Sequence, residues 1–231
     1  MWRYVLPILL AATPIWAEEK TFNFNGIDSI DARNGVTVTV VEGDEVSIVA
    51  NARKGDVDKL SVRKFGPWLA INRDTRWFIF PFGRSDDLEV TVTLPNLRNI
   101  KAYDTALATA SGFSGDTLRA EALEGGTVDL LDVDVVDVTL YATEGGSLTV
   151  AGACQTVVAE AIINAEIAAG DLACANAAAL TRGGGSITAA ATTLASQDDS
   201  LGGTIEILGT PEIVDYLPGM EPEEEAVAAD G

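Results

Sequence analysis

The residues of this 231-residue chain that could do chemistry are its carboxylates, because it has no histidine and only two cysteines. Without histidine there is no Ser-His-Asp or Cys-His nucleophile, no His-ligated zinc and no histidine pH switch. Catalysis or metal binding would have to rely on Asp and Glu, which number 35 against 15 Lys plus Arg. The formal net charge of −20 repels phosphodiester backbones, so we expect no nucleic acid partner.

One stretch of the chain is especially rich in carboxylates, and it is the candidate for a metal site. Calcium binds six to eight oxygen ligands, which such a series could supply from a rigid scaffold. The spacing, however, matches no established calcium loop, so we interpret the series as a solvated surface that discourages lateral aggregation and expect no cofactor. The residues are Asp129, Asp132, Asp134 and Asp137, with Asp116, Glu121 and Glu124 nearby.

The most apolar local sequence, RWFIFPFGRSDD at residues 76–87, is the candidate for a binding site. It places four aromatic side chains, Trp77, Phe78, Phe80 and Phe82, around one proline. If they are exposed, they form a patch that could contact a partner protein, a glycan or a membrane surface. The alternative, which we favour, is a hydrophobic lid that seals the fold, because proteins seldom leave large apolar patches exposed.

The second half of the chain contains a six-residue pattern that recurs every 18–21 residues. The copies are GGTVDL (125–130), GGSLTV (145–150), NAEIAA (164–169), GGSITA (184–189) and GGTIEI (202–207), with a weaker copy, DTALAT (104–109). Within each copy, apolar fourth and mostly small or aliphatic sixth residues flank a residue that is usually polar, which predicts a strand with one buried face. The preceding Gly-Gly predicts a corner that needs positive φ or a close backbone approach.

A unit of about 20 residues cannot bury its apolar face alone, so such units must stack and pair their backbones. The sequence therefore predicts an all-β fold, a right-handed parallel β-solenoid (β-helix) with repeats over residues 103–213. Residues 18–102 carry longer alternating runs, which predict an N-terminal β-sheet, or wider coils, capping the first rung. The runs are 36–41, 45–50, 60–63, 69–72 and 88–94.

The two cysteines, Cys154 and Cys174, are one repeat length apart. In a solenoid they should occupy equivalent places in adjacent rungs, about 4.8 Å apart, which suits a disulfide. We therefore predict a structural disulfide and regard a redox pair as the weaker alternative, since no CxxC spacing is present.

The two ends of the chain differ in composition from the rest. Residues 1–17 contain Arg3 and a 12-residue apolar run, too short to span a bilayer, which predicts a cleaved signal peptide. Residues 220–231 are acidic and predict a disordered tail after a single domain over residues 18–219. We expect an exported protein, in the periplasm or at the cell surface, without stable membrane insertion after signal cleavage.

The chain resembles the GIN-domain family of autotransporter adhesin head domains, which are bacterial exported proteins. The resemblance spans roughly residues 22–219 and is carried by FNGIDSIDARNGVTVTVVEGDE (24–45), LEVTVTLPNLRNI (88–100), the Gly-Gly copies and GGTIEILGTPEI (202–213). It implies a β-solenoid fold and an adhesion-type role, and it brings no catalytic residues. Asn164, where Gly-Gly is replaced, and the aromatic insertion depart from the family pattern.

These observations favour an exported, non-catalytic structural or binding module, adhesin-like, whose partner is an envelope protein or a glycan. One alternative is a carbohydrate-active enzyme on a β-helix, which needs paired carboxylates or a calcium cluster with a basic residue. Between residues 104 and 208 the basic residues are only Arg119 and Arg182. The other alternative is docking to a membrane partner through residues 77–82.

Overall fold

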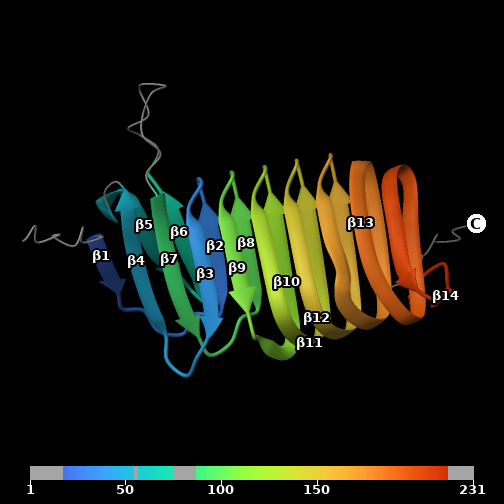
Figure 1. The fold of residues 1–231 in the computed structure, drawn as a ribbon, viewed down its shortest axis with the longest axis horizontal. Helices are drawn as coiled ribbons and strands as arrows, with labels where there is room; N and C mark the ends of the chain where they lie inside the picture. The colour runs from blue at the N-terminus through green and yellow to red at the C-terminus, as the bar shows by residue number, and fades with distance from the viewer. Residues whose placement is uncertain (1–17, 55–56, 75–86, 218–231) are drawn as a thin grey trace, which may run out of the picture.

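The computed structural model describes residues 18–54, 57–74 and 87–217, and most of them belong to strands of one stack (Figure 1). The predicted signal peptide, most of the aromatic segment with Trp77, Phe78, Phe80 and Phe82, and the predicted acidic tail lie outside the described residues. Among the residues described, no helix is both long and apolar enough to cross a bilayer. The elements are β1 (Glu18–Phe22), β2 (Ser29–Arg33), β3 (Thr37–Glu42), β4 (Ser47–Lys54), the 3-10 helix η1 (Val57–Lys59), β5 (Leu60–Phe65), β6 (Trp68–Arg73), β7 (Asp87–Leu94), β8 (Asn99–Tyr103), β9 (Leu107–Ser111), β10 (Ser114–Leu123), β11 (Thr127–Thr143), β12 (Ser147–Ile162), β13 (Glu166–Gly209) and β14 (Glu212–Ile213).

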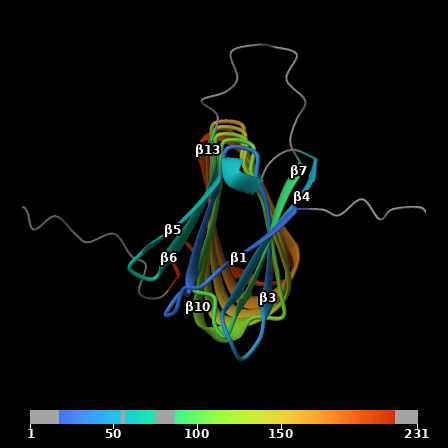
Figure 2. The same cartoon turned by 90° about the vertical axis from the view of Figure 1, so that its left-hand side faces the viewer.

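Each coil of the chain runs up one broad face, turns sharply and runs down the other (Figures 1 and 2). Equivalent strands of successive coils pair in parallel: Val138 of β11 lies beside Val157 of β12, and Leu148 of β12 lies beside Ile167 of β13. The predicted parallel β-solenoid is therefore confirmed.

The sharp turns explain the recurring Gly-Gly pairs. At the turn between β10 and β11, Glu124 and Gly125 both have positive φ, 48° and 73°, and the Gly126 N–H donates to the Leu123 carbonyl at 2.9 Å. Two successive positive φ values are typical of a type I′ turn, which glycine adopts at no steric cost. At Asn164, where the Gly-Gly pattern is broken, φ is 57°, because asparagine tolerates the left-handed region.

The second glycine of each pair is needed because neighbouring rungs approach closely. A Cβ added at Gly126 would lie 2.3 Å from the Ala102 carbonyl oxygen, and one at Gly146 would lie 2.1 Å from that of Ala122. Since real Cβ contacts are never so short, a side chain at either place would push two rungs apart.

Inward side chains of the two faces share one core of aliphatic and alanine residues. On one face Val138, Leu140 and Ala142 are buried, and on the other Leu148 and Val150 are buried. The weak copy at residues 104–109 is offset by one residue from the predicted alignment. Leu107 pairs with Thr127 and is only half-buried, whereas Ala108 pairs with Val128 in the core, so the Gly-Gly equivalents are Thr105 and Ala106.

The N-terminal strands continue the solenoid, but in an order that differs from their order in the sequence. The β2–β3 coil lies between β6 and β7 on one side and β8 and β9 on the other, and it pairs with all four strands in parallel. Antiparallel strands β5, β4 and β1 then close the N-terminal end. The predicted N-terminal cap therefore consists of further coils with antiparallel edges, and the first coil of the sequence is internal.

The predicted disulfide joins Cys154 to Cys174, which are register partners in β12 and β13. Their Cα atoms are 4.5 Å apart. The structural pairing is confirmed, and its position between adjacent rungs follows directly from the repeat length.

Candidate functional site

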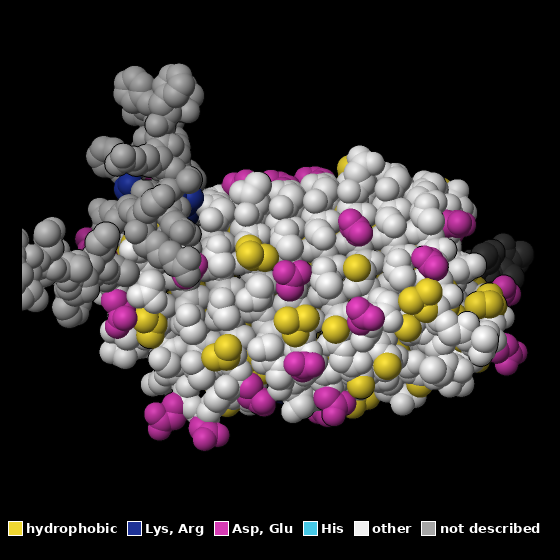
Figure 3. Space-filling model, viewed as in Figure 1, with side chains coloured by type: hydrophobic (Ala, Val, Ile, Leu, Met, Phe, Trp, Pro, Cys, Tyr) yellow, Lys and Arg dark blue, Asp and Glu magenta, His cyan; other side chains and the backbone are white. Residues whose placement is uncertain are grey.

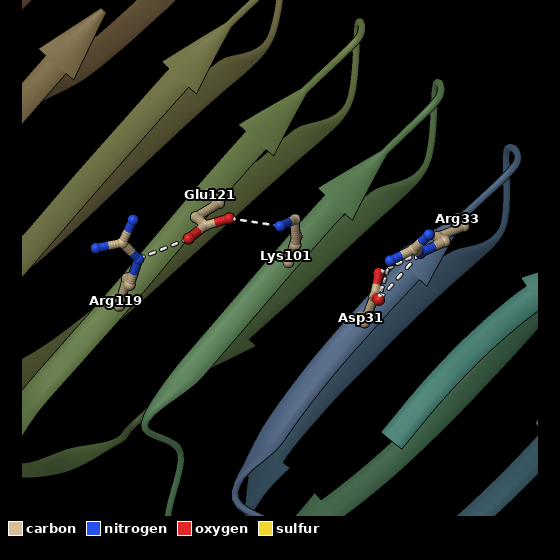
Figure 4. Close-up of polar contacts among 5 residues, drawn as sticks. All are labelled: Asp31, Arg33, Lys101, Arg119 and Glu121. Carbon is tan, nitrogen blue, oxygen red and sulfur yellow. Dashed lines mark hydrogen bonds and ion pairs between the residues drawn. The ribbon is translucent and has the colours of Figure 1, made fainter. Parts of the chain in front are cut away.

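The outward side chains of β2, β8 and β10 form a charged face. Alternation along β2 buries Ile30 and Ala32 and turns Asp31 and Arg33 to the other side of the strand. Parallel register then places Asp31 beside Lys101 of β8, and Lys101 beside Glu121 of β10. We call Asp31, Arg33, Lys101, Arg119 and Glu121 the charged row (Figure 4).

At one end of the charged row, Arg33 forms an ion pair with Asp31, which lies two residues earlier in the same strand. The guanidinium donates to Asp31 through Nε, at 2.8 Å and 3.0 Å, and through a terminal nitrogen at 2.6 Å. This hydrogen bonding raises the pKa of Arg33, although partial burial opposes the rise. Asp31 is thus fully engaged by a partner that remains charged at every physiological pH.

At the other end of the charged row, Glu121 lies between two cations (Figure 4). Lys101 Nζ is 2.7 Å from one carboxylate oxygen, and Arg119 Nε is 2.6 Å from the other. Burial alone would raise the pKa of Glu121, whose side chain is 17% exposed, but the hydrogen bonds from Lys101 and Arg119 outweigh burial and lower it. Glu121 therefore stays ionised at neutral pH.

Tyr103 of β8 links the charged row to the ridge of tight turns. The Arg33 guanidinium lies over its ring, 5.6 Å from the centroid, and its hydroxyl donates to Glu124. That hydrogen bond, together with the negative charges of Glu124, Glu144 and Asp104, raises the pKa of Tyr103. The aromatic ring is thus held between a cation and a row of carboxylates.

Strands β5 and β6 diverge from the stack beside the charged row (Figure 2). A recess of about 590 Å³ is lined by residues of these strands together with Asp31 and Arg33. Ala70 of β6 lies in register between Arg63 of β5 and Asp31 of β2. Because its side chain is a single methyl group, it leaves a hollow between its larger neighbours. The volume falls within the range of small-molecule sites.

The opposite broad face carries hydroxyl groups instead, and we call it the hydroxyl face. Thr39 of β3 lies beside Thr91 of β7 and Thr109 of β9, and Asp129 and Thr149 continue the same row. Figure 3 shows this face with scattered carboxylates and with Lys and Arg side chains visible only beside the N-terminal end. Lys101 and Arg119, which lie further along the stack, belong to the charged face.

The charged row is suited to binding rather than to acid–base catalysis. A glycosidase needs one carboxyl group whose pKa is raised so that it can donate a proton. Glu121 has the opposite shift, and Asp31 is occupied by Arg33. Paired charges fixed on a rigid ladder instead present donors and acceptors whose positions are set before any partner arrives.

Of the described carboxylates singled out in the sequence, one belongs to the charged row, whereas Trp77, Phe78, Phe80 and Phe82 lie outside the described residues. In the acidic series, Asp129 lies on the hydroxyl face, while Asp132, Asp134 and Asp137 lie exposed at the wide corner opposite the tight turns. No group of three or more His, Cys, Asp or Glu among the described residues could hold a metal ion. Glu121 alone of the singled-out carboxylates belongs to the charged row.

Sequence reasoning missed Asp31, Arg33 and Lys101 as site residues. Their signal was nevertheless present: the segments IDAR (30–33), IKAY (100–103) and LRAEAL (118–123) each alternate a buried aliphatic residue with a charged or aromatic one. The segments could have been aligned by this alternation, without any glycine.

A family model described as "Putative auto-transporter adhesin, head GIN domain" matches residues 24–211, whereas no curated protein matches the chain. Among solved structures, a putative adhesin from Bacteroides fragilis is 16% identical with a TM-score of 0.66, covering 87% of this chain and 98% of that one. A putative lipid binding protein from Parabacteroides distasonis is 15% identical with a TM-score of 0.60, covering 86% and 92%. A putative adhesin from Parabacteroides merdae is 14% identical with a TM-score of 0.55, covering 86% and 96%. At these identities the structures share the fold.

Proposed function

Because this chain belongs to the family of auto-transporter adhesin head GIN domains, we propose that it is an exported, non-catalytic binding module that acts in adhesion at the cell envelope. Its partner is an envelope glycan or an envelope protein. Two features support export: the predicted signal peptide and a disulfide of the kind that persists in oxidising compartments.

The observation that carries the proposal is the charged face. Arg and Tyr are enriched where proteins contact partners, and here Arg33 stacks on Tyr103 while its charge is held by Asp31. Both side chains are therefore ordered beforehand, so a partner loses less entropy on binding. The parallel ladder beneath them keeps the strand spacing fixed.

The test is binding to a polysaccharide array and to envelope extracts. We would compare the wild type with a charged-row variant, Lys101→Gln with Arg119→Gln, and with a matched control, Lys64→Gln with Arg182→Gln, which removes one Lys and one Arg from strands outside the row. We expect the control to retain the ligand and the charged-row variant to lose it, with thermal melting confirming that both are folded. Equal retention by all three proteins, or retention by none, would overturn the proposal.

A further inference from the structure

The recess beside the charged row has the side chains of a saccharide site. Its walls combine an aromatic ring, a guanidinium, a hydroxyl and an amide, supplied by Phe65, Arg63, Ser61 and Asn72. Phe65 is 62% exposed, which leaves the ring open to the apolar face of a sugar. The hydroxyl and the amide can pair with sugar hydroxyl groups.

The charge of the recess selects the kind of saccharide. The lining contains four cationic side chains and three carboxylates, so the recess has a small positive charge although the net charge of the chain is −20. The cations are Arg33, Lys59, Arg63 and Arg73, and the carboxylates are Asp31, Asp58 and Asp74. Arg63 is exposed, and none of the described residues forms an ion pair or hydrogen bond with its guanidinium. An unengaged guanidinium suits a carboxylate, which it can bind through two parallel hydrogen bonds.

Across the hollow from Arg63, Arg33 has a terminal nitrogen that is not used in its bonds to Asp31. The side-chain amide of Asn34 donates a hydrogen bond to the side-chain oxygen of Asn72. The side-chain NH2 group of Asn72 therefore remains able to donate to a ligand. A ring seated over Ala70 would therefore meet donors on both sides. About 590 Å³ gives room for two or three sugar units.

We propose that this recess binds an acidic saccharide, a chain of sugars that carry carboxylates, with Arg63 on the carboxylate and Phe65 against the sugar ring. The proposal rests on the proposed function, since it names the class of glycan that the adhesion module recognises. It adds that recognition centres on β5 and β6, at one side of the charged row.

The experiment measures binding of a trimer of galacturonic acid by calorimetry, with the methyl ester of the same trimer as the uncharged control ligand. We expect the acid to bind and the ester to bind at least about tenfold more weakly, because a hydrogen-bonded charge pair is lost. Arg63→Gln should weaken binding of the acid about tenfold for the same reason. Lys64→Gln should leave it unchanged, since Lys64 carries the same charge, follows Arg63 in β5 and points to the other side of the strand.

A second variant tests the recess without removing a charge. Ala70→Phe adds a ring at an outward, strand-compatible position and should abolish binding of the trimer while leaving the melting temperature nearly unchanged. Equal binding of acid and ester, equal effects of Arg63→Gln and Lys64→Gln, or binding that survives Ala70→Phe would overturn the proposal. If the galacturonate trimer does not bind, while the array yields a neutral glycan that the charged-row variant loses, the recess proposal fails and the proposed adhesion function stands.

Discussion

The charged face and the hydroxyl face are built on the same ladder and enclose the same core, yet their outward chemistry differs. On the charged face, Arg33, Lys101 and Arg119 are held by carboxylates, whereas the corresponding rows on the hydroxyl face carry Thr39, Thr109 and Thr149. Inward positions on both faces are mostly aliphatic or alanine, with the buried Thr181 as an exception. A β-solenoid thus separates the residues that specify the fold from those available for recognition, because alternation sends them to opposite sides of every strand.

The largest expected effects come from the core that the two faces share. Leu140 points inward from the charged face and Leu148 from the hydroxyl face, and both are fully buried. Changing either to Ala should lower the free energy of unfolding by about 3 kcal/mol, since each leaves a cavity. Denaturant unfolding under oxidising conditions measures both. A loss of less than about 1 kcal/mol at either position would contradict its burial in the shared core.

Changes at outward positions should lower the free energy of unfolding less than the core changes do, and more on the charged face than on the hydroxyl face. Glu121→Gln removes the charge that Lys101 and Arg119 share and should cost about 1 kcal/mol, a moderate value because Arg119 is half exposed. Asp129→Asn, on the hydroxyl face, should change the unfolding free energy by less than about 0.5 kcal/mol. The same unfolding measurement applies, and equal losses would remove the distinction between the faces.

The contribution of Glu121 should also depend on pH. Its pKa in the folded protein is lowered from 4.5, so the unfolded chain binds a proton more readily than the folded one. The stabilisation is therefore complete above pH 4.5 and is lost as the pH falls through the lowered folded value. Stability curves of wild type and Glu121→Gln, measured from about pH 7 down to about pH 3, should converge in acid. A gap that widens in acid would contradict the assigned shift.

The smallest effect is expected from the threonine row. Thr109 Oγ1 makes only long contacts, 3.5 Å to the Val38 carbonyl and 3.4 Å to Thr39 Oγ1. Thr109→Val keeps the shape and β-branching, so thermal melting and glycan binding should both stay within experimental error of wild type. A marked loss of glycan binding would move recognition to the hydroxyl face.

The repeats of the second half could be predicted from sequence because their geometry requires particular residues. A type I′ turn with a close inter-rung approach leaves few choices besides Gly-Gly, as at Gly145 and Gly146, so the period is visible. The disulfide followed from the same period. The weak copy was misaligned because Leu107 is apolar but points outward, and an aliphatic residue alone does not reveal which face it occupies.

The N-terminal order and the charged row could not be predicted in the same way. Nothing in the sequence of β2 states that it pairs with both β6 and β8, since backbone pairing between distant segments leaves no local mark. The charged row depends on that order, because Asp31 and Lys101 become neighbours only through it. Without its neighbours, Asp31-x-Arg33 predicts only that one side of the strand is polar and exposed to solvent.

The internal position of the β2–β3 coil has a consequence for how the chain acquires its structure. Ser29 and Asn99 are hydrogen-bonded across β2 and β8 although 70 residues separate them, whereas the cysteines of adjacent repeats are separated by 20. Closing the longer loop costs more entropy, and folding slows as the sequence distance between partners grows. In a chain that emerges from its N-terminus, β2 has no parallel partner until β6 has followed and β3 has none until β7 has followed, while later repeats can add one at a time. β2 is paired on both sides only after about 100 residues have emerged, when β8 is available. From there each new repeat can pair with the one before it, so the stack extends one coil at a time toward the C-terminus.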